Sequence, residues 1–372
     1  MASGDYDAVF VGGGLAATLL LHGMRAASPE RVLIVDPEPP TEGPPVHWSY
    51  WSRDPTPYDR LSIGAWRRAR ARDLLPEPIS PFTLRLVRST DVLASLEEAL
   101  EGLPIEQRRV TARSVRLLPG GLYEVATDEE AVRARWVFDS APGVAPGFPS
   151  QGRPRAVLSG TGLRVEADSP VFDDGVATLF DPLDDRSFAY LLPLSATEAL
   201  LESASFGPNG MGEDRERLLG YLESRHPGVG FSVGHAEYGT IPLGFAPART
   251  SGPRHVLLGA KRGLVKPSAG YGVVRIAEDC ERLARLWERG LPLPPSRRAP
   301  QPWRALDAGF LRLAAEEPRL PMALLGRVMG AIPLAQSLGF ISEELGVRRL
   351  GPLLRSAAPV VLGKQGGPAP GS

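Results

Sequence analysis

Three observations predict an α/β fold with an inserted antiparallel sheet and a helical C-terminal part. Residues 5–36 follow the order strand, glycine-rich turn, helix and second strand, which is the order of a βαβ unit. From about residue 152 the sequence changes to strands separated by turns, which is typical of an antiparallel sheet. From Trp303 to Leu362 it consists of short helical patterns broken by proline and glycine.

The N-terminal βαβ unit has the features of a dinucleotide-binding turn. The run DAVFV is apolar and β-branched enough for a buried parallel strand, and the segment GGGLAA follows it. Gly12 allows the tight turn, Gly14 lets the backbone approach a pyrophosphate, and Ala17 permits close helix packing. Asp36 ends the second strand 22 residues after Gly14, close to the roughly 20 expected for a carboxylate that binds a ribose hydroxyl. We therefore expect a Rossmann-type domain, with FAD favoured over NAD because such units open many flavoproteins.

The predicted FAD-binding domain is discontinuous in the sequence. Its first part covers residues 1–150, and its returning part covers residues 245–290, where HVLLGA reads as another buried strand. Between them, residues 151–244 form the predicted antiparallel sheet that binds the substrate. Residues 291–364 form a C-terminal helical region, and residues 365–372 form a flexible tail.

Shorter elements are predicted inside these parts. The stretch PEPPTEGPP must be a loop, PFTLRLV reads as a strand, and the next segment reads as an amphipathic helix capped by Ser89 or Asp91. Strands on either side of a Pro-Gly-Gly turn lead to ARWVFD, a buried strand that ends at Asp139. EDRERLLGYLESR reads as a short helix, and a long helix is expected from about Gly272 to Gly290.

Composition and charge exclude several classes of protein. Hydrophobic residues make up 43% of the 372 residues, which is enough to bury a sizeable core. The 42 basic and 43 acidic residues leave a net charge of −1, so no nucleic-acid partner is expected. The five histidines show no metal-ligand spacing, so no metal site is expected. The single cysteine, Cys280, cannot form an internal disulfide, which favours a reducing, cytoplasmic compartment.

The sequence predicts no membrane-spanning segment. No apolar run reaches the roughly 18–20 residues that a span requires. The first strand also lacks the basic flank of a signal peptide, since Asp5 and Asp7 stand there. The C-terminal third, rich in Leu, Ala, Pro and Arg, has two interpretations: packed helices with arginine-rich outer faces, or amphipathic helices that attach the protein peripherally to a membrane.

Five local patterns occur in a fixed order along the chain. They are GGGLAA (12–17), HWSYW (47–51), the block from LFDP to ALLESASFG (179–207), EYGTIPLG (237–244) and GAKRGLVKPSAGYGVVRI (259–276). Together they resemble the lycopene cyclase family of FAD-dependent carotenoid cyclases, and the likeness runs through about residues 5–310. The resemblance implies a flavoprotein of the glutathione-reductase and hydroxylase type, with a substrate domain inserted in it.

The last of these patterns resembles the glycine-rich segment that lies beside the flavin in this family. The usual flavoprotein Gly-Asp pair is absent, because Ala260 follows Gly259, which fits the cyclase family better than the aromatic hydroxylases. The positions that match the segment are Gly259, Gly263, Lys266, Pro267, Ser268, Gly270 and Tyr271.

The ALLES segment resembles the catalytic element of the family, an aliphatic pair followed by Glu, a second acid and Thr. Glu202 matches the first acid, whereas Ser203 replaces the second acid and Ala204 replaces the Thr. A pattern of two carboxylates has therefore become one in this segment. This departure bears on the substrate rather than on the fold.

The chemistry of the implied reaction favours a buried acid. Cyclising the linear end of a polyene adds a proton to the terminal double bond, lets the next double bond attack the cation, and then releases a proton. The donor must stay protonated in an apolar pocket, where desolvation raises its pKa, and Glu202 lies among Leu and Phe residues. Strand alternation offers the other interpretation, a solvent-facing glutamate on an edge strand. The resemblance implies that FAD is reduced but not consumed, with NAD(P)H as an external reductant.

Two further acids are candidates for the catalytic site. Glu237 matches an acid of the Glu-x-Gly-x-Ile-Pro element of the family, where it shapes the pocket, acts as the second acid, or caps a turn. Asp181 matches an acid of a family strand, and its alternative role is that of a strand-end turn residue before Pro182.

The aromatic cluster HWSYW supplies candidate substrate-binding residues. Trp48, Tyr50 and Trp51 either line a tunnel for an isoprenoid chain or belong to the core, and His47 either faces the substrate ring or is a hydrogen-bonded structural residue. The sequence thus predicts redox-neutral formation of a β-ring on lycopene or a related polyene, by an isomerase of the intramolecular lyase class. The alternatives are a flavin-dependent monooxygenase or isoprenoid reductase on the same scaffold, and a cyclase-like relative that acts on a different polyene.

Overall fold

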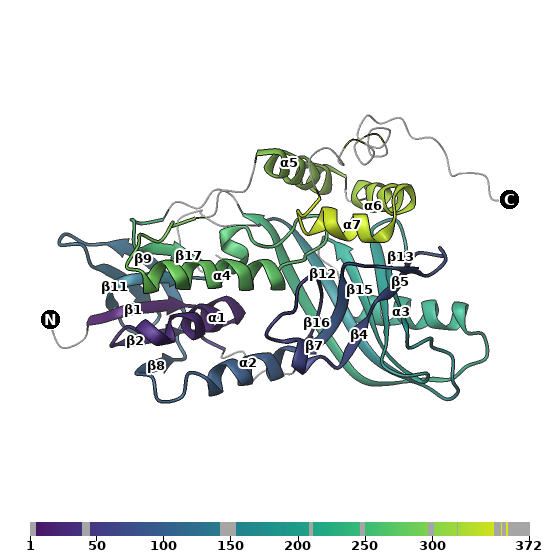
Figure 1. Ribbon diagram of the computed structural model, residues 1–372, viewed down its shortest axis with the longest axis horizontal. Helices are drawn as coiled ribbons and strands as arrows, with labels where there is room; N and C mark the ends of the chain where they lie inside the picture. The colour runs from purple at the N-terminus through teal and green to yellow at the C-terminus, as the bar shows by residue number, and fades with distance from the viewer. Residues whose placement is uncertain are drawn as a thin grey trace.

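The computed structural model describes residues 5–38, 45–141, 154–207, 211–245, 250–296, 301–317 and 319–345, together with residues 351 and 355. Two large sheets lie next to each other along its long axis, and three helices near the C-terminus lie above the second sheet (Figure 1). The predicted α/β class, with an antiparallel sheet and a helical C-terminal part, is confirmed. The predicted flexible tail, residues 365–372, lies outside the described residues.

The first sheet contains the nucleotide-binding unit predicted at the N-terminus. Its strands run in the order β8-β2-β1-β11-β10-β9, and β17 pairs with β11. Five of them are parallel: β1 (Asp5–Val11), β2 (Val32–Val35), β8 (Ile105–Arg108), β11 (Val132–Asp139) and β17 (His255–Leu257). The other two, β9 (Ala112–Leu117) and β10 (Tyr123–Thr127), form the antiparallel pair expected on either side of the Pro-Gly-Gly turn.

Two helices cover one face of this sheet. Helix α1 (Leu15–Met24) starts directly after the glycine turn, and α4 (Val273–Glu288) packs against it in a shared apolar core. Ala17 is fully buried in this core, as its predicted packing role requires. Cys280 of α4 is buried there too, and its thiol donates to the carbonyl of Ala16.

The second sheet is built mainly from the segment predicted to bind the substrate. Its order is β16-β12-β15-β14-β13-β5-β6, and all its pairs are antiparallel except β13 with β5. The strands are β12 (Pro154–Ala167), β13 (Val176–Pro182), β14 (Ser187–Pro193), β15 (Glu198–Phe206), β16 (Phe231–Phe245), β5 (Arg68–Ala71) and β6 (Glu77–Pro78). The domain boundaries stay a prediction, but pairing shows that β5 and β6, from within residues 1–150, belong to this sheet.

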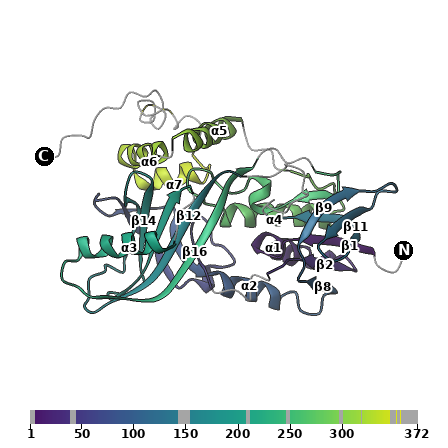
Figure 2. The same cartoon turned by 180° about the vertical axis from the view of Figure 1, so that it is seen from behind.

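The two faces of the second sheet are covered differently (Figures 1 and 2). Helix α3 (Met211–Arg225) lies on one face, whereas the other face packs against the C-terminal helices and a small third sheet. Alternation along β15 separates the two cores, since Leu200 belongs to one and Leu201 to the other. The covering elements are α5 (Gln301–Glu316), α6 (Leu320–Ala331), α7 (Leu334–Ile341), β3 (His47–Ser52), β7 (Thr83–Arg88) and β4 (Gly64–Trp66).

One predicted helix cap is wrong. Helix α2 (Ser89–Glu98) follows Arg88, and no side chain caps its first turn. The hydroxyl of Ser89 instead accepts a hydrogen bond from the backbone N–H of Val46, at 3.1 Å. The remaining short helices are the 3₁₀ turns η1 (Arg25–Ala27), η2 (Asp59–Leu61) and η3 (Gly259–Arg262). Among the described residues, none of the helices combines the length and the apolar composition needed to span a bilayer.

A buried charged cluster joins the returning segment to the first sheet. Asp139, at the end of β11, is fully buried and faces Lys261 (Nζ to Oδ2, 2.6 Å) and His255 (Nε2 to Oδ2, 3.2 Å). Burial alone would raise the pKa of Asp139, but the hydrogen bond from His255 and the charge of Lys261 hold it below its usual value. The Nδ1 atom of His255 accepts from the N–H of Ser251, so Nε2 carries the proton that is donated to Asp139.

Candidate active site

A cavity of about 360 Å³ lies between the second sheet, strand β3 and the glycine-rich turn that precedes α4. Strands β12, β15 and β16 supply one wall, and residues 269–273 supply another. Its apolar lining includes Trp48, Trp51, Leu158, Phe188, Ile241 and Val273. Two carboxyl groups, those of Glu202 and Glu237, face this otherwise apolar space.

The two glutamates lie in one row across three neighbouring strands. Gly162 of β12 pairs with Glu202 of β15 on one side and with Glu237 of β16 on the other. Side chains at directly paired positions point to the same face of a sheet. Because Gly162 has no side chain, Glu237 can lean over it, and a Cβ atom there would lie 2.7 Å from the Cγ of Glu237. The sheet therefore brings together two carboxyl groups that are 35 residues apart in the sequence.

Glu202 has the surroundings of a protonated acid. Its Oε2 atom is buried and has no hydrogen-bond partner among the described residues. The pKa of Glu202 is raised to about 8, mainly by burial and secondly by the charge of Glu237. A hydrogen bond with the Ser49 hydroxyl lowers this pKa and offsets part of the rise. The carboxyl group is therefore mostly protonated at neutral pH.

Glu237, in contrast, is surrounded by donors. The backbone N–H of His47 donates to both its oxygens, at 3.0 and 3.2 Å, and the Nδ1 atom of His47 lies 2.8 Å from Oε2. The Nε2 atom of His235 donates to the carbonyl oxygen of Pro45 at 3.1 Å and lies 3.5 Å from the Oε2 atom of Glu237. Glu202 thus has one buried oxygen without a partner and a raised pKa, whereas both oxygens of Glu237 face hydrogen-bond donors, so the two carboxyl groups of the row have different surroundings.

The structure does not bring the third predicted acid to the cavity. Asp181 faces α3, where its Oδ2 atom accepts from the Tyr221 hydroxyl at 2.7 Å and pairs with Arg225 at 2.5 Å. Strand β13 is irregular here: its register shifts before Asp181, and Phe180 has φ of +53°. The bulge turns Asp181 towards the helix, which corrects its predicted place beside Glu202.

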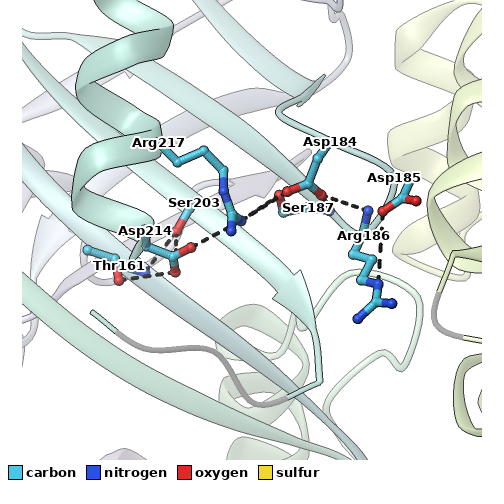
Figure 3. Close-up of polar contacts among 8 residues, drawn as sticks. All are labelled: Thr161, Asp184, Asp185, Arg186, Ser187, Ser203, Asp214 and Arg217. Carbon is cyan, nitrogen blue, oxygen red and sulfur yellow. Dashed lines mark hydrogen bonds and ion pairs between the residues drawn. The ribbon is translucent and has the colours of Figure 1, made fainter. Parts of the chain in front are cut away.

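Position 203 also faces away from the cavity. Figure 3 shows that Ser203 points towards α3, where its hydroxyl donates to Asp214 at 3.0 Å. The hydroxyl of Thr161 donates to the same oxygen at 3.3 Å, and Arg217 lies 3.3 Å from the other oxygen. A carboxylate at position 203 would therefore meet the fully buried Asp214 rather than Glu202. Glu237 supplies the second carboxyl group beside Glu202.

The predicted aromatic residues divide between cavity and core. His47, Trp48 and Trp51 line the cavity. Tyr50 does not; it is fully buried in the core, where its hydroxyl bonds to Thr56 and Asp59 at 3.1 and 3.2 Å. The prediction that Tyr50 binds the substrate is thus replaced by a structural role, whereas His47 both lines the cavity and holds Glu237.

The glycine turn after β1 has room for a phosphate. A Cβ atom at Gly14 would meet nothing within 4 Å, so space lies open at the start of α1. Gly12 has φ of +91°, and a Cβ there would lie 2.5 Å from the Ser140 hydroxyl, so this position requires glycine for the turn itself. Asp36 closes β2, and its Oδ2 atom accepts from the N–H of Gly13 at 2.6 Å. The residues present fit a dinucleotide whose pyrophosphate lies at the helix start.

The returning segment brings the second predicted cofactor motif next to the cavity. Gly259 begins η3 and Gly263 follows it, whereas Pro267 is buried farther along. The turn from Lys266 to Tyr271 is closed by the N–H of Lys266, which donates to the carbonyl of Tyr271 at 2.7 Å. Gly270 and Tyr271 then line the cavity opposite the glutamates. A Cβ at Gly270 would lie 2.8 Å from Leu158 of the second sheet, so glycine permits this close approach.

Four site residues were not identified from the sequence. Ser49 lies inside the HWSYW pattern, and Tyr190 pairs with Glu202 from β14. Gly162 stands inside a strand pattern, which is a recognised sign of close approach by a neighbour. His235 is two residues before Glu237, so strand alternation places both on one face.

Comparison with known proteins gave one family match and several structural neighbours. The family described as "Lycopene cyclase protein" matches residues 7–316. The flavin-dependent brominase Bmp2 has a TM-score of 0.62 at 14% identity, covering 97% of this chain and 100% of its own. A geranylgeranyl bacteriochlorophyll reductase-like protein from Thermoplasma acidophilum has a TM-score of 0.58 at 14% identity, covering 97% and 98%. The halogenase PltM, solved with phloroglucinol and FAD, has a TM-score of 0.52 at 12% identity, covering 96% and 86%.

Because the sequence identities are low, these similarities show the fold alone. It is a fold that flavoprotein oxidoreductases and halogenases share. No curated protein sequence matched the chain.

The raised pKa of Glu202 predicts a pH-dependent component of stability. Between about pH 4.5 and about pH 8 the folded protein keeps a proton on Glu202 that the unfolded chain loses, so the free energy of unfolding falls as pH rises. Glu202→Gln removes this component, whereas the control Glu166→Gln, on the exposed surface of β12, keeps it. Urea unfolding across this pH range measures the difference. Parallel curves for wild type and Glu202→Gln would contradict the burial of an uncharged acid.

Gly162→Ala tests the contact between the two glutamates. The added methyl group displaces Glu237, so the pKa of Glu202 should fall, as followed by the infrared band of the protonated carboxyl group. In a Glu237→Gln background the same substitution should have no further effect. Gly239→Ala is the control, because a Cβ at this position of β16 meets nothing within 4 Å. Equal shifts in both backgrounds would show that Gly162 acts on Glu202 by another route.

Proposed function

The chain belongs to the lycopene cyclase family, and from this premise we propose that it is an FAD-dependent enzyme that closes a β-ring on a linear polyene. The proposed reaction is redox-neutral: lycopene or a related polyene is converted to an isomer with one end cyclised. The observation that carries this proposal is the buried carboxyl group of Glu202, whose Oε2 atom has no partner among the described residues and which lines a mostly apolar cavity beside Glu237. Such an acid can protonate a hydrocarbon double bond in a site that excludes water.

The two glutamates have separate proposed roles. Glu202 transfers its proton to the terminal double bond of the polyene, and the next double bond attacks the resulting cation, so that one carbon–carbon bond closes the ring. Glu237, held by the backbone and imidazole of His47, accepts the proton that leaves the ring carbon, and the electrons of that C–H bond form the new double bond. A proton returned from Glu237 to Glu202 completes the cycle, and no electrons are gained or lost.

The remaining walls stabilise the cation and exclude water. Trp51 and Tyr271 stack with ring centroids 4.4 Å apart and form an aromatic part of the cavity lining. An aromatic face attracts a cation through its quadrupole. Apolar side chains such as Leu158 and Phe188 make up most of the exposed lining and limit the number of polar groups that could capture the cation.

The proposed cofactor is FAD in its reduced form. The turn at Gly12 and Gly14, the buried Ala17 and the carboxylate of Asp36 would hold its ADP part, and residues 259–271 would lie beside its ring. When bound, reduced FAD would supply an electron-rich ring near the cation, and NAD(P)H is the proposed external reductant. Because the polyene is insoluble in water, peripheral contact of the cytoplasmic protein with a membrane is part of this proposal.

Expression in a lycopene-accumulating bacterium tests the proposal. Cyclisation changes the absorption of the pigment but leaves its mass unchanged, and the retention time of the product shows whether one or both ends react. A product that gained hydrogen, with one NADPH consumed per molecule, would move the protein to the reductases. A product that gained oxygen would move it to the monooxygenases, and absence of any change would point to a different polyene.

Glu202→Gln should abolish most of the activity. The amide keeps the size of the side chain but has no acidic proton, so turnover should fall by roughly 10²–10⁴-fold. In the wild type, activity should decline as pH rises through about 8, because the donor is then ionised. FAD content and the melting temperature of the variant serve as controls for folding. Near-normal turnover of Glu202→Gln would remove Glu202 from the mechanism.

Gly14→Val should empty the FAD site without unfolding the protein. No described atom lies within 4 Å of a Cβ at Gly14, so the branched side chain fits the protein but occupies the phosphate position. Flavin absorbance of the purified variant should therefore be lost while its circular dichroism is kept. Gly12→Val is the contrasting variant, because its side chain strikes Ser140 and strains the turn. A Gly14→Val protein with a full complement of FAD would exclude this turn as the phosphate site.

A further inference from the structure

A turn outside the family-matched region contacts the aromatic wall of the cavity. Residues 342–344 follow α7, whereas the family match ends at residue 316. The hydroxyl of Ser342 accepts a hydrogen bond from Nε1 of Trp51 at 2.9 Å. Two residues on, Glu344 pairs with Arg53 at 3.1 Å. The C-terminal part therefore contacts the strand end that carries a cavity-lining side chain.

Trp51 is fixed by three contacts, two of which come from Tyr271. The indole stacks on the Tyr271 ring at a centroid distance of 4.4 Å and an interplanar angle of 16°, and the Tyr271 hydroxyl donates to the backbone carbonyl of Trp51 at 2.6 Å. Stacking restrains the tilt of an indole but leaves it free to slide and rotate in its own plane. The hydrogen bond to Ser342 restrains the in-plane rotation, because Nε1 is the one polar atom of the ring.

Ser342 is itself held in place by the charged residue that follows it. Glu343 has φ of +62°, which is uncommon for a residue with a side chain. Its Oε1 atom lies 3.3 Å from Nζ of Lys266 and 3.1 Å from the guanidinium of Arg275, and all three side chains are buried. A strained backbone conformation persists where surrounding contacts determine it. The ion pairs thus anchor the turn that presents the Ser342 hydroxyl.

The ion pair between Glu343 and Lys266 connects the turn at residues 342–344 with the part of the cavity lining that carries Tyr271. Lys266 begins the closed turn that carries Gly270 and Tyr271 into the cavity lining. Its ammonium group also pairs with Asp307 of α5 at 2.6 Å and lies 4.9 Å from the centre of the Trp303 ring. Helices α5 and α7 therefore hold both partners of the Trp51–Tyr271 stack.

We propose that Ser342 is a positioning residue that fixes the orientation of the Trp51 indole within its plane, and through it the shape of the aromatic side of the cavity, for a flat, conjugated hydrocarbon. The identity of this ligand rests on the proposed function. A planar polyene end has no polar atoms to orient it, so the planes of the rings beside it set its position. Ser342 touches no substrate atom in this role; it acts through Trp51 and, by a hydrogen bond with the Tyr271 hydroxyl, through Tyr271.

The chain offers a matched control for this role. Ser337 of α7 is fully buried, and its hydroxyl has no hydrogen-bond partner among the described residues. Ser337→Ala and Ser342→Ala thus make the same chemical change within six positions of each other, and only the second removes a contact to Trp51. Trp51→Phe keeps an aromatic ring but removes the N–H group that donates a hydrogen bond to the Ser342 hydroxyl.

Lycopene in detergent is the probe, and its binding is followed by quenching of the tryptophans that remain in each variant. Ser342→Ala should weaken binding by roughly threefold to tenfold, the worth of one hydrogen bond, while Ser337→Ala should bind as the wild type does. In the Trp51→Phe background, Ser342→Ala should have a smaller effect than in the wild type, because the contact with Nε1 is already absent and only the contact with the Tyr271 hydroxyl is lost. The pH dependence of turnover should be the same in all variants.

The outcomes separate this proposal from the proposed function. Wild-type protein that binds lycopene but forms no ring would overturn the cyclase proposal, and the binding series would still test Ser342. Unchanged binding by Ser342→Ala, or additive effects of Ser342→Ala and Trp51→Phe, would overturn the positioning role. Wild-type protein that does not bind lycopene would overturn lycopene as the ligand of this cavity, and the same series would then be measured with a different polyene.

Discussion

The arrangement of the site depends on the cost of keeping a carboxyl group in an apolar cavity beside a second carboxylate. An isolated charge there would be strongly disfavoured, so Glu202 keeps its proton, and its pKa rises to about 8. The oxygens of Glu237, in contrast, face the backbone N–H and the imidazole of His47. Two glutamates in one row of the sheet thus have different surroundings, because one has a buried oxygen without a partner and the other faces hydrogen-bond donors.

The rest of the second sheet maintains this difference. Strand pairing fixes the row, and Gly162 leaves the space in which the two side chains meet. On the opposite face, Ser203 and Thr161 bind Asp214 of α3, so the polar groups next to the row in sequence are satisfied away from the cavity (Figure 3). A sheet with two differently covered faces therefore separates the acid that is used from the acids that hold the structure together.

Sequence reasoning succeeded where the signals are local. The glycine turn with its flanking strands, the Pro-Gly-Gly hairpin and the inserted antiparallel sheet follow from patterns within a few residues. It failed where a side chain's direction depends on a distant partner. Asp181 is turned by a bulge in β13, Ser203 is one residue out of phase with the cavity, and the approach of Glu237 to Glu202 requires a third strand between them. Neither residue spacing nor composition contains the pairing register that decides these cases.

The two main walls of the cavity are stabilised by different means, and ion pairs with the C-terminal region help to hold one of them. The acid-bearing wall consists of paired strands, whose backbone hydrogen bonds hold it without outside help. The opposite wall is a turn, closed on itself between Lys266 and Tyr271 and free of strand pairing. Contacts outside the turn help to hold it, and those from the C-terminal region are the ion pairs of Lys266 with Asp307 and Glu343. Substitutions in that region can therefore reshape the aromatic side of the cavity while the paired acids stay in place, so the two sides of the site can vary independently.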